Sequence, residues 1–342
     1  MTTRKATIVD IALMARVSTA TVDRVLNGRP GVSAANRQRV KTAATALGYL
    51  PGVGGVTLPS RPAHLEFFLP LGRSEFMETL AQSIASFTAG LPLVASCTIH
   101  SVDGLEPDAM VKAVEKTALR TSGVGVIAVD HPATQAVFQR LSDAGVRIVT
   151  IASDLPTSPR SAYVGVDNRM AGRTAGLVMG RMAGPKSGTL GLFLGSRAYH
   201  GHVEREIGFR AVITEQFPDL HLHEAIEMGE DNAQSYDAAS HLLRSRSDIV
   251  GIYCVGAGRL GIARAIKDIG RPRPFVIFHD LTRRTKEFLM DDLIDVLIDQ
   301  NARLIGEQSV IRLLGSIAST APFLTLKYIE PRIILRENIP AG

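Results

Sequence analysis

The sequence predicts an α/β protein in which a small all-α domain precedes two α/β lobes built on parallel sheets. Apolar residues recur at helical spacing through residues 7–47, whereas apolar runs of strand length alternate with amphipathic segments from residue 63 onward. Residues 51–62 between these regions are rich in proline and glycine, as is typical of a linker. We therefore expect a helical domain over 1–50, a hinge over 51–62 and two lobes over 63–342.

The first two predicted helices are short and are joined by a tight turn. Apolar residues between Ile8 and Ala15 fall on one face of the first helix, and Val22 and Val25 fall on one face of the second. Ser18 is placed to cap the second helix, because its hydroxyl can accept from a free backbone N–H there. This pattern is a helix-turn-helix, a motif that enters the major groove of DNA. A third helix follows, with Ser33 as its cap and an apolar stripe of Val40, Ala43, Ala44 and Leu47.

The charge of the chain is concentrated at its N-terminal end. The 342 residues carry a net charge of +5, and residues 1–60 hold eight Lys or Arg against two acids. A small basic domain attached to a nearly neutral body suits a polyanionic partner, because each neutralised phosphate releases counterions. The charge distribution therefore supports DNA as the partner of the helix-turn-helix.

Several classes of protein are disfavoured by the same sequence. The two cysteines, Cys97 and Cys254, lie far apart in apolar runs, so we expect reduced thiols rather than a disulfide or a metal site. The pairs His200/His202 and His221/His223 indicate a metal only by adjacency, so no metal is expected. We find neither an apolar leader nor an 18-residue apolar run, and we expect a cytoplasmic protein without a membrane partner.

The region after the linker alternates between strands and helices. Such alternation predicts parallel sheets covered by helices on both faces, and its length favours two lobes with a ligand cleft between them. Strands are predicted at 64–69, 93–99, 124–129, 146–151, 189–194, 249–255, 275–278 and 294–298. Helices are predicted at 76–87, 108–119, 134–144, 168–182, 204–216, 235–244, 260–269 and 282–290.

The N-terminal residues resemble the headpiece of the LacI family of bacterial transcriptional regulators. The resemblance lies in Thr7-Ile-Val-Asp-Ile-Ala, in Val17-Ser-Thr-Ala-Thr-Val-Asp-Arg-Val-Leu-Asn-Gly and in Leu47-Gly-Tyr-Leu-Pro. The α/β region is similar to periplasmic sugar-binding proteins of the ribose-binding type, which have two Rossmann-like lobes. Membership implies a homodimer on a pseudo-palindromic operator in double-stranded DNA. It also implies a small effector in the cleft that modulates DNA affinity, with no catalytic residues and no cofactor.

The resemblance assigns DNA contacts to individual residues. Thr19 and Ala20 match the variable base-reading pair at the start of the recognition helix, and Arg24 matches the arginine further along it. Arg24 is expected to carry most of the direct readout, because the other two cannot make a bidentate base contact. The remaining candidate contacts, which set register on the DNA rather than read its sequence, are Thr7, Ser18, Thr21, Asn27, Ser33 and Asn36.

Three departures from the family pattern bear on DNA recognition. Asp23 stands where the family usually has serine, and it would repel phosphate unless it pairs with Arg24 or accepts from a cytosine amino group. Arg16 replaces a turn glycine, which costs strain if the turn needs a left-handed backbone. The hinge keeps Leu58 as a candidate minor-groove wedge, but its three glycines weaken any hinge helix.

Effector contacts are expected where polar residues follow strands. Arg205 lies in a Glu-Arg-x-x-Gly-Phe segment that places its arginine on sugar hydroxyls in ribose-type proteins; the alternative is a surface ion pair. Asp280 and Gln300 each follow a predicted strand and match polar cleft residues of the family. The other candidates are Arg73, Phe76 as a surface for a sugar ring, and Asp154, which is an effector contact or a cap. Asp167 and Asn168 are expected to cap the helix at 168–182, with effector binding as the alternative.

The strongest competing signal is the sequence Gly256-Ala-Gly258-Arg-Leu-Gly261. It follows a predicted strand, opens a helix and precedes Asp280 by about 20 residues, as in a dinucleotide-binding motif. This hypothesis makes the chain an NAD(H)-dependent oxidoreductase. Another hypothesis is a binding protein whose glycine-rich hinge has cost it operator binding. The regulator hypothesis explains the basic helix-turn-helix and is preferred, with repression relieved by a carbohydrate effector favoured over corepression.

Overall fold

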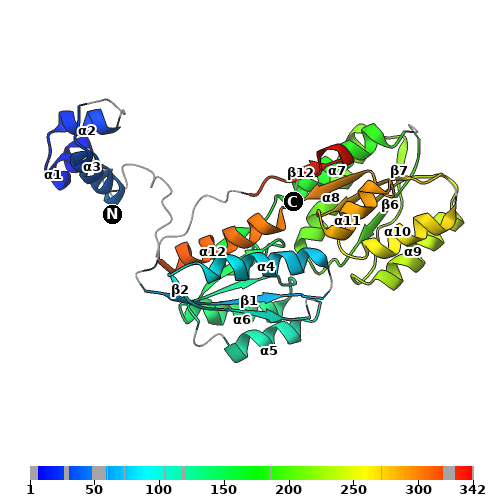
Figure 1. The fold of residues 1–342 in the computed structure, drawn as a ribbon, viewed down its shortest axis with the longest axis horizontal. Helices are drawn as coiled ribbons and strands as arrows, with labels where there is room; N and C mark the ends of the chain where they lie inside the picture. The colour runs from blue at the N-terminus through cyan, green and yellow to red at the C-terminus, as the bar shows by residue number, and fades with distance from the viewer. Residues whose placement is uncertain are drawn as a thin grey trace. The chain divides into compact units, whose positions relative to one another are not determined.

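The computed structural model divides the chain into two compact units, Met1–Thr57 and Leu58–Gly342, which we describe separately (Figure 1). It describes residues 7–26, 31–47, 59, 61–72, 74–103, 105–117, 121–184, 187–270, 272–318 and 328–340.

The first unit contains the three predicted helices. They are α1 (Ile8–Ala15), α2 (Thr19–Leu26) and α3 (Ala34–Ala46). The predicted apolar faces meet in one small core, in which Ile11, Val22 and Val40 are almost fully buried. The predicted caps are confirmed, since the N–H of Thr21 donates to Ser18 Oγ at 3.2 Å and the N–H of Asn36 donates to Ser33 Oγ at 3.3 Å.

The turn between α1 and α2 requires a left-handed residue. Arg16 has φ 52° and ψ 52°, and its N–H donates to the carbonyl groups of Ala12 and Leu13 at the end of α1. Its own carbonyl accepts from the guanidinium of Arg39 on α3 at 3.2 Å. A side chain in this conformation costs about 1–2 kcal/mol relative to the right-handed region, a cost that glycine avoids.

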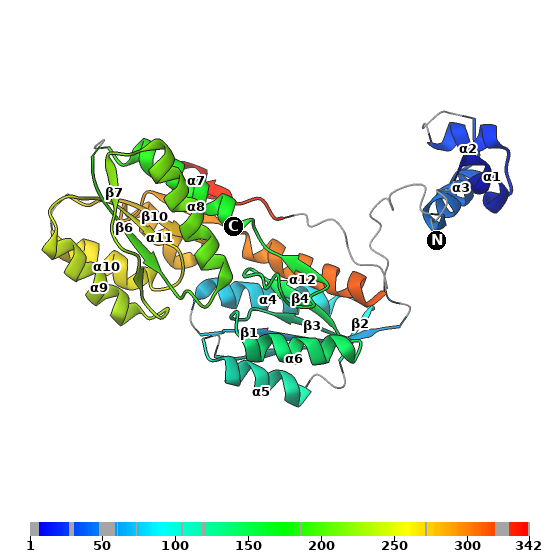
Figure 2. The same ribbon diagram turned by 180° about the vertical axis from the view of Figure 1, so that it is seen from behind.

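The second unit begins with a lobe built on a five-stranded sheet, all of it parallel. Its strands are β1 (Ala63–Leu69), β2 (Val94–Ser101), β3 (Gly123–Val126), β4 (Arg147–Ile151) and β5 (Ala162–Val164), in the order β2-β1-β3-β4-β5. Its helices are α4 (Glu75–Ala89), α5 (Pro107–Thr117), α6 (Pro132–Asp143) and α12 (Ala302–Ala318). Helices α4 and α12 cover one face of the sheet, and α5 and α6 cover the other (Figures 1 and 2).

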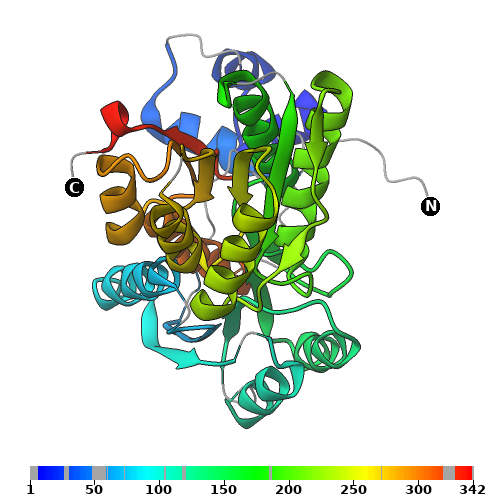
Figure 3. The same ribbon diagram turned by 90° about the vertical axis from the view of Figure 1, so that its right-hand side faces the viewer.

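The second lobe repeats this plan around a seven-stranded sheet. Its strands are β6 (Gly188–Leu194), β7 (Leu220–Leu222), β8 (Ile226–Glu227), β9 (Ile249–Cys254), β10 (Phe275–His279), β11 (Val296–Asp299) and β12 (Arg332–Ile334). Its helices are α7 (Asn168–Met182), α8 (His200–Gln216), α9 (Asn232–Ser245), α10 (Arg259–Ile269) and α11 (Arg283–Met290). The strand order is β12-β11-β10-β9-β6-β7, with β8 also paired to β6. Helices α7 and α8 pack on one face of the sheet and α9 to α11 on the other (Figure 3).

The chain passes between the lobes three times. It crosses from β5 to α7, returns from β11 to α12, and crosses again to reach β12. The predicted parallel sheets are confirmed, and the exception is β12, which pairs antiparallel to β11 because it enters the second lobe along the third crossing. Helix α12 was not predicted, because its buried face includes Gly306 and Ser309 and the apolar stripe is interrupted. Strands β5, β7 and β8 are too short to show alternation.

Among the described residues, no helix is both long enough and apolar enough to cross a membrane.

Cys97 and Cys254 are both free thiols. Cys254 is buried in β9, and burial raises the pKa of its thiol to about 12. Cys97 is only half-buried on the edge strand β2.

The backbone of Arg16 generates a stability prediction. Replacing Arg16 with glycine should stabilise the helical domain by about 1 kcal/mol relative to Arg16→Ala, because alanine retains the left-handed strain and glycine does not. Hydrogen exchange of the α1 and α2 amides in the full-length chain measures this difference. Equal protection in the two variants would show that the turn is not strained.

Candidate functional site

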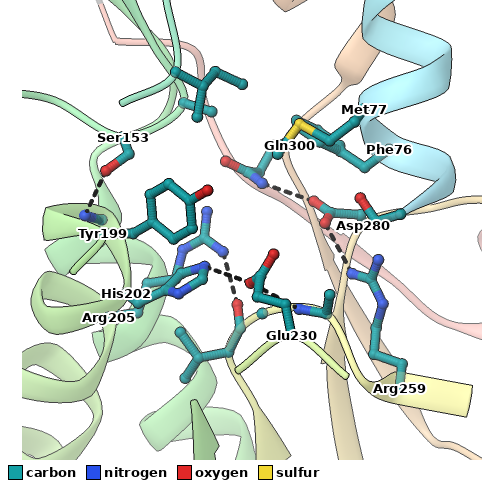
Figure 4. Close-up of a pocket in the computed structure, with 17 residues that line it drawn as sticks. Phe76, Met77, Ser153, Tyr199, His202, Arg205, Glu230, Arg259, Asp280 and Gln300 are labelled. Carbon is teal, nitrogen blue, oxygen red and sulfur yellow. Dashed lines mark hydrogen bonds and ion pairs between the residues drawn. The ribbon is translucent and has the colours of Figure 1, made fainter. Parts of the chain in front are cut away.

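A pocket lies between the two lobes, at the carboxyl ends of the parallel strands of both sheets (Figure 4). In open α/β sheets the strand ends are where ligands bind, because the loops that follow the strands converge there. The first lobe contributes Ser74, Phe76, Met77, Ile127, Ala152 and Ser153. The second lobe and the crossing into α12 contribute Tyr199, Gly201, His202, Arg205, Glu230, Val255, Gly256, Ala257, Arg259, Asp280 and Gln300.

Arg205 supplies a buried positive charge to this pocket. Its Nε donates to Asn168 Oδ1 at 2.8 Å and its Nη1 donates to the Val255 carbonyl at 3.0 Å, both of them neutral acceptors. The side chain comes from α8, which approaches α7 closely because Gly172 has no side chain. A Cβ at Gly172 would lie 2.1 Å from the Arg205 carbonyl oxygen. Residue Arg205 is only 4% exposed, and its guanidinium points into the pocket (Figure 4). The alternative of a surface ion pair for Arg205 is therefore not what the structure shows.

Asn168 connects this arginine to the first lobe. Its Nδ2 donates to the Ala152 carbonyl at 3.0 Å and to the Tyr163 hydroxyl at 3.2 Å. The expected cap of α7 is supplied by Asp167 alone, whose carboxylate accepts from the N–H of Met170 at 2.9 Å. Nearby, the N–H of Gly201 donates across the lobes to Ser153 Oγ at 3.1 Å. The two lobes are thus joined by hydrogen bonds directly beside the pocket.

A second polar group in the pocket is built on Asp280. Its Oδ2 accepts from Arg259 at 2.9 Å and its Oδ1 accepts from the amide of Gln300 at 2.7 Å. All three side chains are less than 10% exposed. The Oε1 of Gln300 is buried and has no hydrogen-bond partner in the part of the chain that the structure describes, so it is an acceptor to which a ligand can donate.

Glu230 and His202 also line the pocket, although neither was predicted as an effector contact. The Glu230 carboxylate lies 3.8 Å from His202 Nε2 and accepts a long hydrogen bond of 3.4 Å from the N–H of Ala257. Burial lowers the pKa of His202, against the opposing effect of Glu230, and its Nδ1 lies 3.0 Å from the Ser196 carbonyl oxygen. The only available signal for Glu230 was an acid shortly after a two-residue strand, which is too short to recognise.

Phe76 and Tyr199 give the pocket apolar surfaces. Phe76 lies in the first turn of α4 and is 3% exposed, and Tyr199 precedes α8 and packs edge-on to His202 with ring centroids 5.3 Å apart. Such rings suit the apolar face of a ligand that also carries hydrogen-bonding groups.

The structure does not bring every predicted effector residue to the pocket. Asp154 is directed elsewhere, because its carboxylate pairs with Arg160 and accepts from Thr150 Oγ1 at 2.7 Å and from the N–H of Leu155 at 2.8 Å. Of the two alternatives for Asp154, the loop cap is therefore the one observed, and its neighbour Ser153 lines the pocket instead. Arg73 lies outside the described residues.

The glycines of the competing motif have structural roles. Gly258 precedes α10 with φ 87°, and a Cβ at Gly261 would lie 2.0 Å from the Asn232 carbonyl oxygen in the neighbouring α9. Arg259 at the start of α10 already binds the Asp280 carboxylate that the motif would offer to a ribose. The motif is therefore explained by helix packing without a nucleotide.

The described residues contain no cluster of three or more metal-ligating side chains.

The first unit presents its candidate contacts along α2. Ser18, Thr19, Ala20 and Arg24 are exposed, and Thr21 is partly exposed. Ser33 is also exposed, while Asn36 is half-buried and accepts from Arg39 at 3.3 Å. The Thr7 hydroxyl donates to Asp10 at 2.6 Å within the capping box of α1, so its donor is already engaged. Asn27 and Leu58 lie outside the described residues.

Comparison with known proteins gives two family matches. Residues 7–52 match the model of bacterial regulatory proteins of the lacI family, and residues 66–314 match the model of a periplasmic binding protein domain. The regulator MalR of Streptomyces coelicolor is 27% identical over 281 residues, which cover 80% of this chain and 78% of MalR. The repressor CytR of Escherichia coli K12 is 56% identical over 46 residues, 14% of each chain.

The fold of the second unit is also found among solved structures. GanP, a glucose-galactose binding protein from Geobacillus stearothermophilus, superposes with a TM-score of 0.74 at 18% identity. The superposition covers 82% of this chain and all of GanP. At this identity the likeness establishes the fold alone.

The packing role of Gly261 can be tested directly. Gly261→Ala should destabilise the protein by about 1–3 kcal/mol, because the added Cβ overlaps the α9 backbone. Thermal unfolding measures the loss, and Gly90→Ala is the matched control because nothing lies within 4 Å of its added Cβ. Saturable binding of NADH in a calorimetric titration, weakened by Gly261→Ala, would contradict the packing explanation.

Proposed function

We propose that a neutral carbohydrate effector, bound between the two lobes, controls the affinity of this LacI-type DNA-binding transcriptional regulator for operator DNA. The observation that carries the proposal is the buried guanidinium of Arg205, which faces the pocket and, among the described residues, is bonded to two neutral acceptors and to no carboxylate. A buried cation is costly unless its hydrogen-bonding capacity is used, and an effector uses the part that the protein leaves open.

The charges around the pocket favour a neutral effector. Arg205 and Arg259 are balanced by Glu230 and Asp280, so a ligand with a carboxylate or phosphate would face two acids. The open acceptors, including Gln300 Oε1, require a ligand that donates hydrogen bonds. Hydroxyl groups both donate and accept, and the rings of Phe76 and Tyr199 offer apolar surfaces for a sugar or polyol. The sugar named for GanP is consistent with this class of ligand.

Control of DNA binding requires an effector that favours one arrangement of the lobes over another. The lobes already touch at one rim of the pocket, where Glu75 accepts from the N–H of Arg284 at 2.9 Å. Partial burial acts to raise the pKa of Glu75, but this bond and the guanidinium groups of Arg283 and Arg284 outweigh it and lower the pKa. We propose that the effector stabilises the closed arrangement, and that a homodimer conveys the change to its paired DNA-binding domains in the cytoplasm.

In the DNA-binding domain, we propose that Arg24 reads a base and that Thr19 and Ala20 make apolar or single hydrogen-bond contacts. Four further polar residues are proposed to position the domain on DNA phosphates, namely Ser18, Thr21, Ser33 and Asn36. Thr7 would contact a phosphate through its hydroxyl oxygen or its backbone. Asn27 and the wedge Leu58 keep the roles that the family resemblance gives them.

A ligand screen tests the proposed effector class. Neutral pentoses, hexoses and polyols are screened for thermal stabilisation of the full-length protein, and the best compound is measured by calorimetry. Arg205→Ala should weaken its binding at least tenfold, because a charge-assisted hydrogen bond is worth about 1.5–3 kcal/mol.

Two further variants make the ligand test decisive. Arg205→Lys keeps the charge but lacks the planar fork, and it should also bind weakly. Arg173→Ala, on the surface of α7, should bind as the wild type does. Binding of a neutral compound that is unchanged by both Arg205 substitutions would place the effector elsewhere.

Arg24 provides the test of DNA recognition. Arg24→Ala should lower affinity for the specific operator by about 1–3 kcal/mol, while affinity for unrelated duplex DNA stays nearly unchanged. Footprinting of the upstream region followed by fluorescence anisotropy at fixed salt measures both quantities. A parallel loss on specific and unrelated DNA would assign Arg24 to the phosphate backbone instead.

A further inference from the structure

Glu230 is a buried acid that forms no ion pair with a Lys or Arg in the described part of the chain. Residue Glu230 is 8% exposed, and among the described residues no Lys or Arg lies within 4 Å of its carboxylate. Its carboxylate accepts from the N–H of Ala257 at 3.4 Å and lies 3.8 Å from His202 Nε2. A carboxylate usually accepts several short hydrogen bonds when it is buried, so Glu230 retains unused acceptor capacity on the pocket side.

Two glycines, Gly195 and Gly256, leave room for the Glu230 carboxylate because they have no Cβ. A Cβ at Gly195 would lie 2.1 Å from Glu230 Oε1, and a Cβ at Gly256 would lie 2.9 Å from the same oxygen. Glu230 itself has φ 61°, a left-handed conformation that costs a non-glycine residue conformational energy. Strain of this kind persists where the surrounding structure fixes it, and such positions cluster at ligand sites.

Arg205 presents the opposite charge to the same pocket. Among the described residues, no carboxylate lies within 4 Å of its guanidinium, and its two bonds go to Asn168 and to a carbonyl oxygen. The pocket therefore holds one buried cation and one buried anion that are not paired with each other, and both face its interior (Figure 4). A group that accepts from Arg205 and donates to Glu230 would satisfy both.

We propose that Glu230 is a specificity-determining effector contact, and that one effector hydroxyl bridges it to Arg205. The hydroxyl oxygen accepts from the Arg205 guanidinium and its hydrogen is donated to the Glu230 carboxylate. This inference rests on the proposed function, because it assumes a neutral polyhydroxy effector. It deepens that function by assigning recognition of a single hydroxyl to Glu230 together with Arg205, whereas the family resemblance supplied Arg205 alone.

The charge pair also suits a zwitterion, with a carboxylate on Arg205 and an ammonium group on Glu230. The hydroxyl assignment is favoured because Gln300 Oε1 requires a further donor and because Asp280 adds a second acid to the pocket. A ligand carboxylate would be repelled by Asp280, whereas a hydroxyl would not. An amino acid or an amino sugar is therefore the outcome against which the proposal is tested.

The test is a thermodynamic cycle on the full-length protein that combines single substitutions of Glu230 with changes to the ligand. Its probe is the neutral sugar or polyol that most stabilises the wild type in the thermal screen, together with the set of its monodeoxy analogues. Binding is measured by calorimetry for the wild type, Glu230→Gln and Glu230→Ala. Glu224→Gln is the matched control, because Glu224 is exposed nearby in the chain and does not line the pocket.

We expect one monodeoxy analogue to bind the wild type about 10- to 100-fold more weakly than the parent compound, as for a hydrogen bond to a charged group. In Glu230→Ala the difference between that analogue and the parent compound should become smaller, because only the hydrogen bond from Arg205 to the hydroxyl remains. Glu230→Gln keeps the side-chain shape and an acceptor for the Ala257 N–H, so it should fold normally and show an intermediate loss. Glu224→Gln should match the wild type.

The outcomes separate the two proposals. If no neutral compound binds the wild type, the proposed function fails and the hydroxyl bridge fails with it. If a neutral compound binds equally to the wild type, Glu230→Gln and Glu230→Ala, only the assignment of Glu230 is overturned. If an amino acid or amino sugar binds more tightly than every neutral compound and loses this advantage in Glu230→Gln, Glu230 recognises an ammonium group and the hydroxyl bridge is wrong.

Discussion

The contact on which the effector-binding unit depends is the hydrogen bond from Arg205 to Asn168. Burying a guanidinium is costly, and the structure offsets the cost with two neutral acceptors that also fix its direction. Asn168 then donates to the Ala152 carbonyl in the first lobe, so one amide both orients the cation and spans the junction of the lobes. A ligand that changes the environment of Arg205 acts on the same bonds that join the lobes, which gives a physical route from binding to closure.

The rest of the pocket follows from the topology of the two sheets. Both sheets end at the same cleft, and the loops after β4, β8 and β10 place Ala152, Glu230 and Asp280 in it with positive φ. The left-handed backbone of these three residues costs conformational energy. It persists because side-chain packing and hydrogen bonding around the cleft stabilise the turns. The glycines of α7, α8 and α10 allow the helices to approach closely, so their role is in packing even where their spacing imitates a nucleotide motif.

The sequence predicted the parts whose pattern is local. Helix-turn-helix spacing located α1 to α3, and apolar runs located eight strands to within a few residues, because both rest on periodicity. Phe76, Arg205, Asp280 and Gln300 were found because they follow recognisable strands or lie in a family motif, and the structure places all four around the pocket. Glu230 and His202 were not predicted as effector contacts, because long-range packing brings them to the pocket. For Asp154 the sequence left an effector contact and a cap as alternatives, and the structure shows the cap, because Arg160 holds Asp154 outside the pocket while Ser153 lines it.

The central claim is that the pocket and the DNA-binding domain are thermodynamically coupled, and reciprocal binding measures this most directly. Operator affinity of the full-length protein is measured with and without saturating effector, and effector affinity is measured with and without operator. The account predicts that both affinities change by the same factor, of about 5- to 150-fold, because linkage is reciprocal. An operator affinity that is unchanged by an effector bound in the pocket would contradict it.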